Sequence, residues 1–172
     1  MALISSRLVG FPNPVNEKAA RVVAGLVVVT AATALVLQTG WLLWLLALGF
    51  LLRVLSGPRF SPFGLLATTV VAPRLGRPTL VPGPPKRFAQ GLGLAVSLSA
   101  AVWVTAGATT VGWTLVGLLI AAAVLESVFA FCLGCVIFGF LQRAGWVPES
   151  VCEACADLGS ASRRDAYPVT QR

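Results

Sequence analysis

The sequence predicts an all-α integral membrane protein built as a four-helix bundle, and two observations predict it. Of its 172 residues, 57% are hydrophobic, and only 13 basic and 6 acidic side chains are present. A soluble domain needs roughly a quarter of its residues charged to cover its surface. The apolar residues also fall in blocks of about 20, the length that crosses a bilayer as a helix. The lipid bilayer is therefore the first expected partner.

Four apolar blocks predict four spans, at about 19–38, 41–55, 88–106 and 113–142. Asn13 before Pro14, or Asn16 before Glu17, supplies a helix start for the first span. Small residues in the third span recur at four-residue spacing, which lets helices approach closely in lipid: Gly91, Ala95 and Ser99 in one row, Gly93, Ser97 and Ala101 in another. We take residues 1–158 as one membrane domain, with a CxxC segment at 148–158, and 159–172 as a disordered tail.

The basic residues set the expected orientation. The turns at 39–40 and 107–112 carry no charge, whereas Arg7, Lys18 and Arg21 lie before or at the start of the first span, the long loop at 56–87 holds basic residues and no acidic one, and Arg143 follows the fourth span. Basic loops face the cytoplasm, so both termini are predicted to be cytoplasmic, in a multi-pass protein of the inner (plasma) membrane. The net charge of +7 is thus explained without nucleic acid, which is not expected as a partner. Within the loop, the apolar stretch 61–72 is too short to span and predicts an interfacial or re-entrant helix.

All four cysteines occur as two CxxC pairs. Cys132 and Cys135 fall in the last third of the fourth predicted span, and Cys152 and Cys155 fall in the cytoplasmic tail. On a helix, residues three apart point to roughly one side. The linker between the pairs is long enough for the tail to fold back, so that all four sulfur atoms can meet. Histidine is absent, which excludes imidazole metal ligands and histidine acid–base catalysis.

Several chemistries fit these thiols. The first hypothesis is thiol-redox or sulfur-transfer chemistry, in which the tail pair exchanges with a thioredoxin-like or sulfurtransferase protein and Cys132 and Cys135 act at the membrane. The second is a binding or transport site for zinc or another thiophilic metal, since C-x2-C-x16-C-x2-C lies within the range of four-thiolate sites. A pair of structural disulfides is a less favoured hypothesis, because the cytoplasm is reducing. A non-enzymatic membrane scaffold is the third hypothesis.

Glu126 is the single acidic residue within the predicted spans. An ionised carboxylate inside a membrane is costly, so we expect it to be protonated, paired or facing a polar cavity. It either carries a proton or hydrogen-bonds hydroxyl groups on neighbouring helices, for which Thr30, Thr33, Ser97 and Ser99 are candidates. In a continuous fourth helix its side chain aligns with Ala130 and Leu133 rather than with the cysteines.

Several stretches together resemble a bacterial membrane family, the domain of unknown function DUF4395. The resemblance covers about residues 11–156 and rests on four stretches: Asn16-Glu17-Lys18 with Arg21, the Gly57–Gly64 loop, Pro84–Ala89, and Cys132-Leu133-Gly134-Cys135 with the tail cysteines. It implies a polytopic membrane protein in a sulfur-metabolism and thioredoxin setting. It brings no established activity and no catalytic residues.

Overall fold

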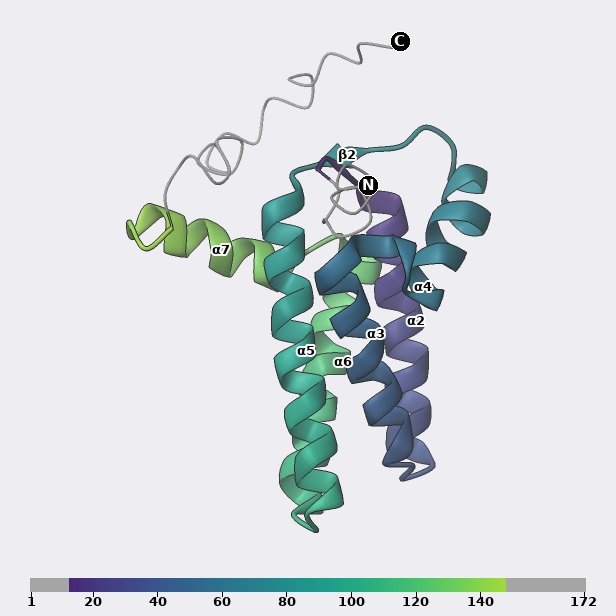
Figure 1. Ribbon diagram of the computed structural model, residues 1–172, viewed down its shortest axis with the longest axis vertical. Helices are drawn as coiled ribbons and strands as arrows, with labels where there is room; N and C mark the ends of the chain where they lie inside the picture. Colours follow the sequence, from purple (N-terminus) through teal and green to yellow (C-terminus); the bar gives the residue numbers. More distant parts are fainter. Residues whose placement is uncertain (1–12, 148–172) are drawn as a thin grey trace, which may run out of the picture.

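The computed structural model describes residues 13–147, and four long helices form the body of this part of the chain. They are α2 (Glu17–Val36), α3 (Trp41–Ser56), α5 (Gly83–Thr105) and α6 (Thr109–Phe129). Figure 1 shows them running side by side, with short turns at one end and the long loop at the other. A shorter helix, α7 (Leu133–Arg143), leaves the bundle across its axis. The predicted all-α architecture is confirmed.

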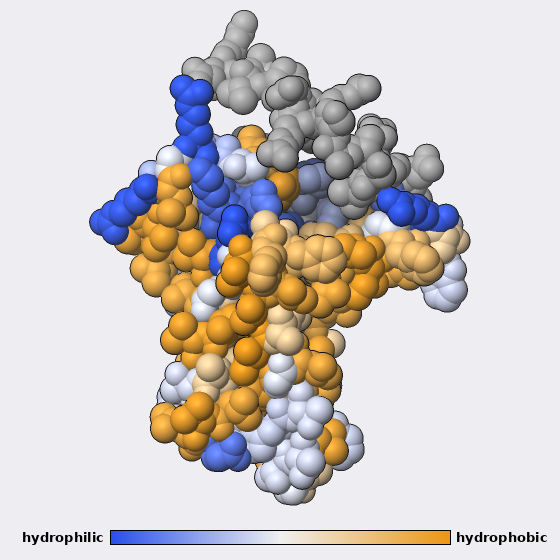
Figure 2. Space-filling model, turned by 180° about the vertical axis from the view of Figure 1, so that it is seen from behind, coloured by the Kyte–Doolittle hydropathy of each residue, from blue (hydrophilic) through white to orange (hydrophobic). Residues whose placement is uncertain are grey.

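The bundle core combines alanines with a few large apolar residues such as Leu43 and Leu46, and most of the large apolar surface lies outside it. The core includes Ala31, Ala34, Ala100 and Ala101, all fully buried, whereas many large apolar side chains are exposed. Figure 2 shows this apolar surface on one face of the bundle, with hydrophilic side chains gathered mainly at the loop end. Four helical segments are long and apolar enough to cross a membrane: Glu17–Val36, Trp41–Leu75, Gly83–Thr105 and Thr109–Phe129. An apolar exterior of this kind needs lipid as its solvent.

One of the two small-residue rows on α5 is a helix contact. Gly93, Ser97 and Ala101 are buried, and a Cβ built on Gly93 would lie 2.3 Å from the Phe50 ring of α3. In the other row, Ala95 and Ser99 are exposed. The prediction of close packing therefore holds for the first row and is wrong for the second.

Two helix starts show how local sequence signals act. Asn16 caps α2, since its side-chain Oδ1 accepts a hydrogen bond from the Lys18 backbone N–H at 3.0 Å. The third span begins at Gly83, five residues earlier than predicted, with prolines in its first turn. Proline is well suited to a first turn because the N–H it lacks would have no partner there.

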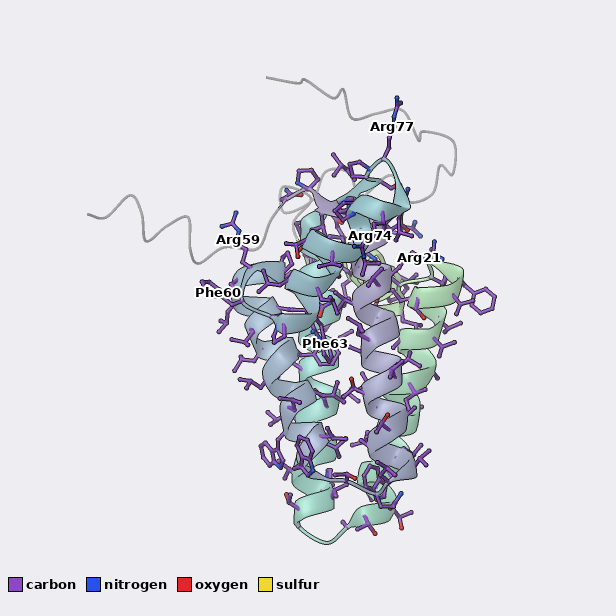
Figure 3. All side chains as sticks on the ribbon, turned by 90° about the vertical axis from the view of Figure 1, so that its right-hand side faces the viewer. Arg21, Arg59, Phe60, Phe63, Arg74 and Arg77 are labelled. Atoms are coloured by element: carbon purple, nitrogen blue, oxygen red, sulfur yellow. The ribbon has the colours of Figure 1, made fainter. Side chains whose placement is uncertain are left out.

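The long loop is largely helical and packs against α2. It contains η1 (Gly57–Arg59), α4 (Pro62–Leu65), η2 (Leu66–Val71) and η3 (Ala72–Leu75). Ala67 and Ala72 are buried against Ala19 and Val23, and Figure 3 shows Phe63 pointing toward the bundle interior. An interfacial position for this segment stays a prediction.

A two-residue ladder, which the sequence did not predict, ties the loop to the start of α2. Strand β1 (Val15–Asn16) pairs antiparallel with β2 (Leu80–Val81), with Val15 opposite Val81. Each strand is too short to have a recognisable alternation of its own.

The fourth span ends at Phe129 instead of continuing to residue 142, so the prediction of one long helix is wrong. Ala130 adopts a left-handed conformation, with φ at 57°, and the Phe131 N–H donates to the Leu125 carbonyl at 3.0 Å. This is a helix-closing geometry. The 21 residues of α6 already span about 31 Å at a rise of ~1.5 Å per residue, roughly the thickness of a hydrocarbon core. The remaining apolar residues form α7.

Candidate functional site

The break after α6 is held by an arginine from the first helix. Arg21 donates from Nε to the Ser127 carbonyl at 3.1 Å and from Nη2 to the Val128 carbonyl at 3.0 Å. These carbonyls lie in the last turn of α6, where no intrahelical N–H is available to them. A basic residue that the sequence assigned to orientation therefore also stabilises the helix end.

Helix α7 is seated on α5 by a close backbone approach. A Cβ on Gly134 would lie 2.5 Å from the Cα of Ala89, so only glycine fits at this contact. One turn further along, the Phe138 ring packs against Phe88 with their centroids 5.7 Å apart. The first turn of α7 is thereby fixed against the loop end of α5.

Cys132 and Cys135 occupy the start of α7. Cys132 is the N-cap residue and Cys135 lies in the first turn. Both are free thiols; Cys132 is buried and Cys135 is partly exposed. A CxxC pair at a helix N-terminus places its sulfur atoms at the positive end of the helix dipole, where a thiolate is favoured.

Glu126 forms an ion pair with Lys86. Their Oε1 and Nζ atoms are 2.8 Å apart, and the two side chains are 14% and 8% exposed. The predicted hydroxyl partners on neighbouring helices are wrong: Thr30 donates to the Leu26 carbonyl of its own helix and Ser97 to the Leu94 carbonyl. Lys86 had been assigned to the loop, but the early start of α5 carries it into the bundle.

The break after Phe129 also changes the relation between Glu126 and the cysteines. Together with Cys132, Glu126 lines an apolar cavity of about 380 Å³ between the helices. A second cavity of about 460 Å³ is lined by Lys86, Cys132, Cys135 and Arg143, among others. A continuous helix would have pointed Glu126 away from the thiols, whereas the turn at Ala130 brings the ion pair beside them.

The two thiols differ in acidity. The pKa of Cys132 is lowered, chiefly by a hydrogen bond from the Cys135 side chain, and Lys86 lowers it further. Burial and the Glu126 carboxylate oppose this shift. The pKa of Cys135 is raised, first because its proton is held in that same hydrogen bond and then by burial. Cys132 is therefore the thiol that ionises first, and Cys135 retains the proton.

The other two cysteines of the predicted site, Cys152 and Cys155, lie outside the described residues. Within residues 13–147 no group of three or more His, Cys, Asp or Glu side chains gathers as metal ligands would. A four-thiolate zinc site thus depends on the tail pair. The predicted contact between the two CxxC pairs also involves Cys152 and Cys155, so it stays a prediction.

The fold and this site together define a polytopic α-helical membrane protein with a dithiol at the base of a short surface helix. Residues 15–143 match the family described as Domain of unknown function (DUF4395). The chain belongs to this family, and the match includes Cys132, Cys135, Lys86 and Glu126 but ends before the tail cysteines. Neither the curated proteins nor the solved structures contain a match to the chain.

Proposed function

We propose that the protein is a membrane-bound thiol-redox protein in which Cys132 and Cys135 exchange with a disulfide or dithiol of a partner. The observation that carries this proposal is the placement of both free thiols at the start of α7, with Cys132 the more acidic of the two. Exchange requires a thiolate to attack and a second thiol to resolve the mixed disulfide. The pair supplies both.

In the oxidising direction the Cys132 thiolate attacks one sulfur of a partner disulfide. A mixed disulfide forms, and the first partner thiolate leaves and takes up a proton. Cys135 then loses its proton and attacks the Cys132 sulfur, which closes the internal disulfide and releases the second partner thiolate. Two electrons pass from the CxxC pair to the partner. Each partner thiolate takes up one proton from solvent, which balances the proton that Cys132 lost on ionising and the proton that Cys135 loses. The reverse sequence reduces Cys132 and Cys135.

The proposed partner is a water-soluble thioredoxin-like protein or sulfurtransferase on the cytoplasmic side. The dithiol cavity is lined by Lys86 and Arg143, and Figure 3 shows Arg59, Arg74 and Arg77 in the loop half of the molecule. Under the positive-inside rule this basic end faces the cytoplasm. In a reducing compartment the pair would cycle rather than form a permanent disulfide. The tail pair, Cys152 and Cys155, would relay electrons to Cys132 and Cys135.

The test is a redox titration of the full chain in membranes. Replacing Cys152 and Cys155 by Ser isolates the α7 pair. The membranes are equilibrated with mixtures of reduced and oxidised dithiothreitol, and free thiols are counted with a maleimide mass tag. We expect Cys132 and Cys135 to titrate together as one two-electron couple.

A matched variant separates exchange from simple oxidation. Cys135→Ser should accumulate a mixed disulfide with an added thioredoxin-like protein, because the resolving thiol is gone, whereas Cys132→Ser should not. Independent alkylation of the two thiols at every potential, or equal trapping by both variants, would refute the proposal.

A further inference from the structure

A second buried cluster lies at the loop end of the bundle, and its centre is Arg53 in the last turn of α3. This arginine is 3% exposed. Its Nε donates to the Gln90 Oε1 at 2.8 Å, its Nη1 donates to the Ser61 Oγ at 3.2 Å, and its guanidinium stacks 4.4 Å from the Phe50 ring centroid. The Nη2 atom is buried and has no hydrogen-bond partner. A guanidinium has five N–H donors, and two of them are on this atom.

The cluster also has too few carboxylates. Glu17 and Glu126 are the acidic residues among residues 13–147, and Glu126 is paired with Lys86. Arg53 and Lys86 are therefore two buried cations that interact with one carboxylate, Glu126, which leaves a net charge of +1 while the Cys132 thiol is protonated. A buried charge without a partner is costly, and so is a buried donor without an acceptor. Both are relieved by one anionic group that accepts hydrogen bonds.

A cavity of about 200 Å³ adjoins these groups. Its polar lining includes Arg53, Lys86, Gln90, Asn16 and Thr68. The polar groups come from β1, α3, α5 and the loop helix η2, so the site exists only in the folded bundle. Since a water molecule takes about 30 Å³ of liquid volume, the cavity has room for a small oxyanion with one or two waters.

We propose that this cavity binds a monoanionic oxyanion group, with Arg53 Nη2 as its principal donor and Lys86 as its second cation. The charge of +1 matches one negative charge, and a planar guanidinium edge matches paired phosphate or carboxylate oxygens. The group is either a free anion or the phosphodiester of an anionic phospholipid. This site is separate from the thiol exchange, although Lys86 borders both cavities.

The test is a binding measurement on the delipidated full chain in neutral detergent by native mass spectrometry. Two probes are used in separate arms: inorganic phosphate at pH 6, where the monoanion predominates, and phosphatidylglycerol. We expect one bound probe per chain. Binding of phosphate identifies a free-anion site, and binding of phosphatidylglycerol alone identifies a lipid-headgroup site; both outcomes support the proposal if they depend on Arg53.

Matched variants decide that dependence. Arg53→Met should weaken binding by about tenfold or more, the loss expected for a charge-assisted hydrogen bond. Arg77→Met removes the same charge from an exposed loop position and should leave binding unchanged. If Arg53→Met does not fold, Thr68→Leu fills the cavity without removing a charge and should also weaken binding. The proposal would be overturned if neither probe bound saturably to the wild-type chain. It would also be overturned if Arg53→Met, or Thr68→Leu where Arg53→Met does not fold, bound the probe as tightly as Arg77→Met.

Discussion

Replacing Glu126 by Gln removes the carboxylate that neutralises Lys86 while keeping the size of the side chain. The pair is 2.8 Å apart and both side chains are nearly buried. At an effective dielectric of about 20, two charges ~4 Å apart interact by about 4 kcal/mol. Breaking a buried pair by removing one partner costs about 3–5 kcal/mol. We expect Glu126→Gln to lower the free energy of unfolding by about 3 kcal/mol, at the low end of this range, because the amide oxygen still accepts a hydrogen bond from Lys86.

Removing Glu126 and removing Lys86 should destabilise the protein to different extents. Glu126→Gln leaves Lys86 and Arg53 buried without the carboxylate that interacts with both of them. Lys86→Met leaves Glu126 with Arg53, which already interacts electrostatically with it. We therefore expect Lys86→Met to cost only about 1–2 kcal/mol, and the double variant to recover part of the loss caused by Glu126→Gln alone. Glu126→Lys adds a third cation, with a cost of about 2.5–3.5 kcal/mol on insertion scales, and should not accumulate in membranes.

The assay is unfolding by sodium dodecyl sulfate in mixed micelles, followed by the fluorescence of the five tryptophans. Glu17→Gln is the control, since it removes the other acidic residue of the described part of the chain. It should cost no more than about 1 kcal/mol, the size of a helix-dipole effect. The reasoning would be refuted if Lys86→Met lowered the free energy of unfolding as much as Glu126→Gln. It would also be refuted if both variants lowered it by less than about 0.5 kcal/mol.

Three further predictions follow from the helix break, the thiols and the orientation. Ala130→Gly should raise the free energy of unfolding by about 1 kcal/mol, since glycine adopts a left-handed conformation without the Cβ penalty, and a decrease in the same unfolding assay would contradict the geometry of the break. With the tail cysteines replaced by Ser, the pH midpoint for alkylation of Cys132 should be higher in Cys135→Ala than in Cys135→Ser, because serine still donates a hydrogen bond to the thiolate; equal midpoints would show that this bond does not lower the pKa. A reporter active only outside the cytoplasm, fused after Arg172, should give no signal, and strong activity would reverse the assigned orientation.

In the described part of the chain, the features that the sequence predicted correctly are those encoded within one segment. Block length and low charge predicted four spanning helices, and the Asn16 cap and the Gly93 row were visible in the residues themselves. These features depend on hydrophobicity and spacing within one segment, so a single sequence contains them. The row with Ala95 and Ser99 failed because spacing shows that a row exists but not which neighbour it faces.

The composition of the site was decided by tertiary structure. Ala130 is an ordinary helix former, and the residues around it do not predict a left-handed turn. The break is stabilised by Arg21 from another helix and by the close approach of Gly134 to Ala89. Lys86 and Arg53 satisfy the rule for basic residues flanking a span, and the sequence cannot show that they turn inward. A charge near a helix end can lie outward toward water or inward toward a carboxylate. Only the packing of the helices decides between these, because the partner of each charge lies on a different segment of the chain.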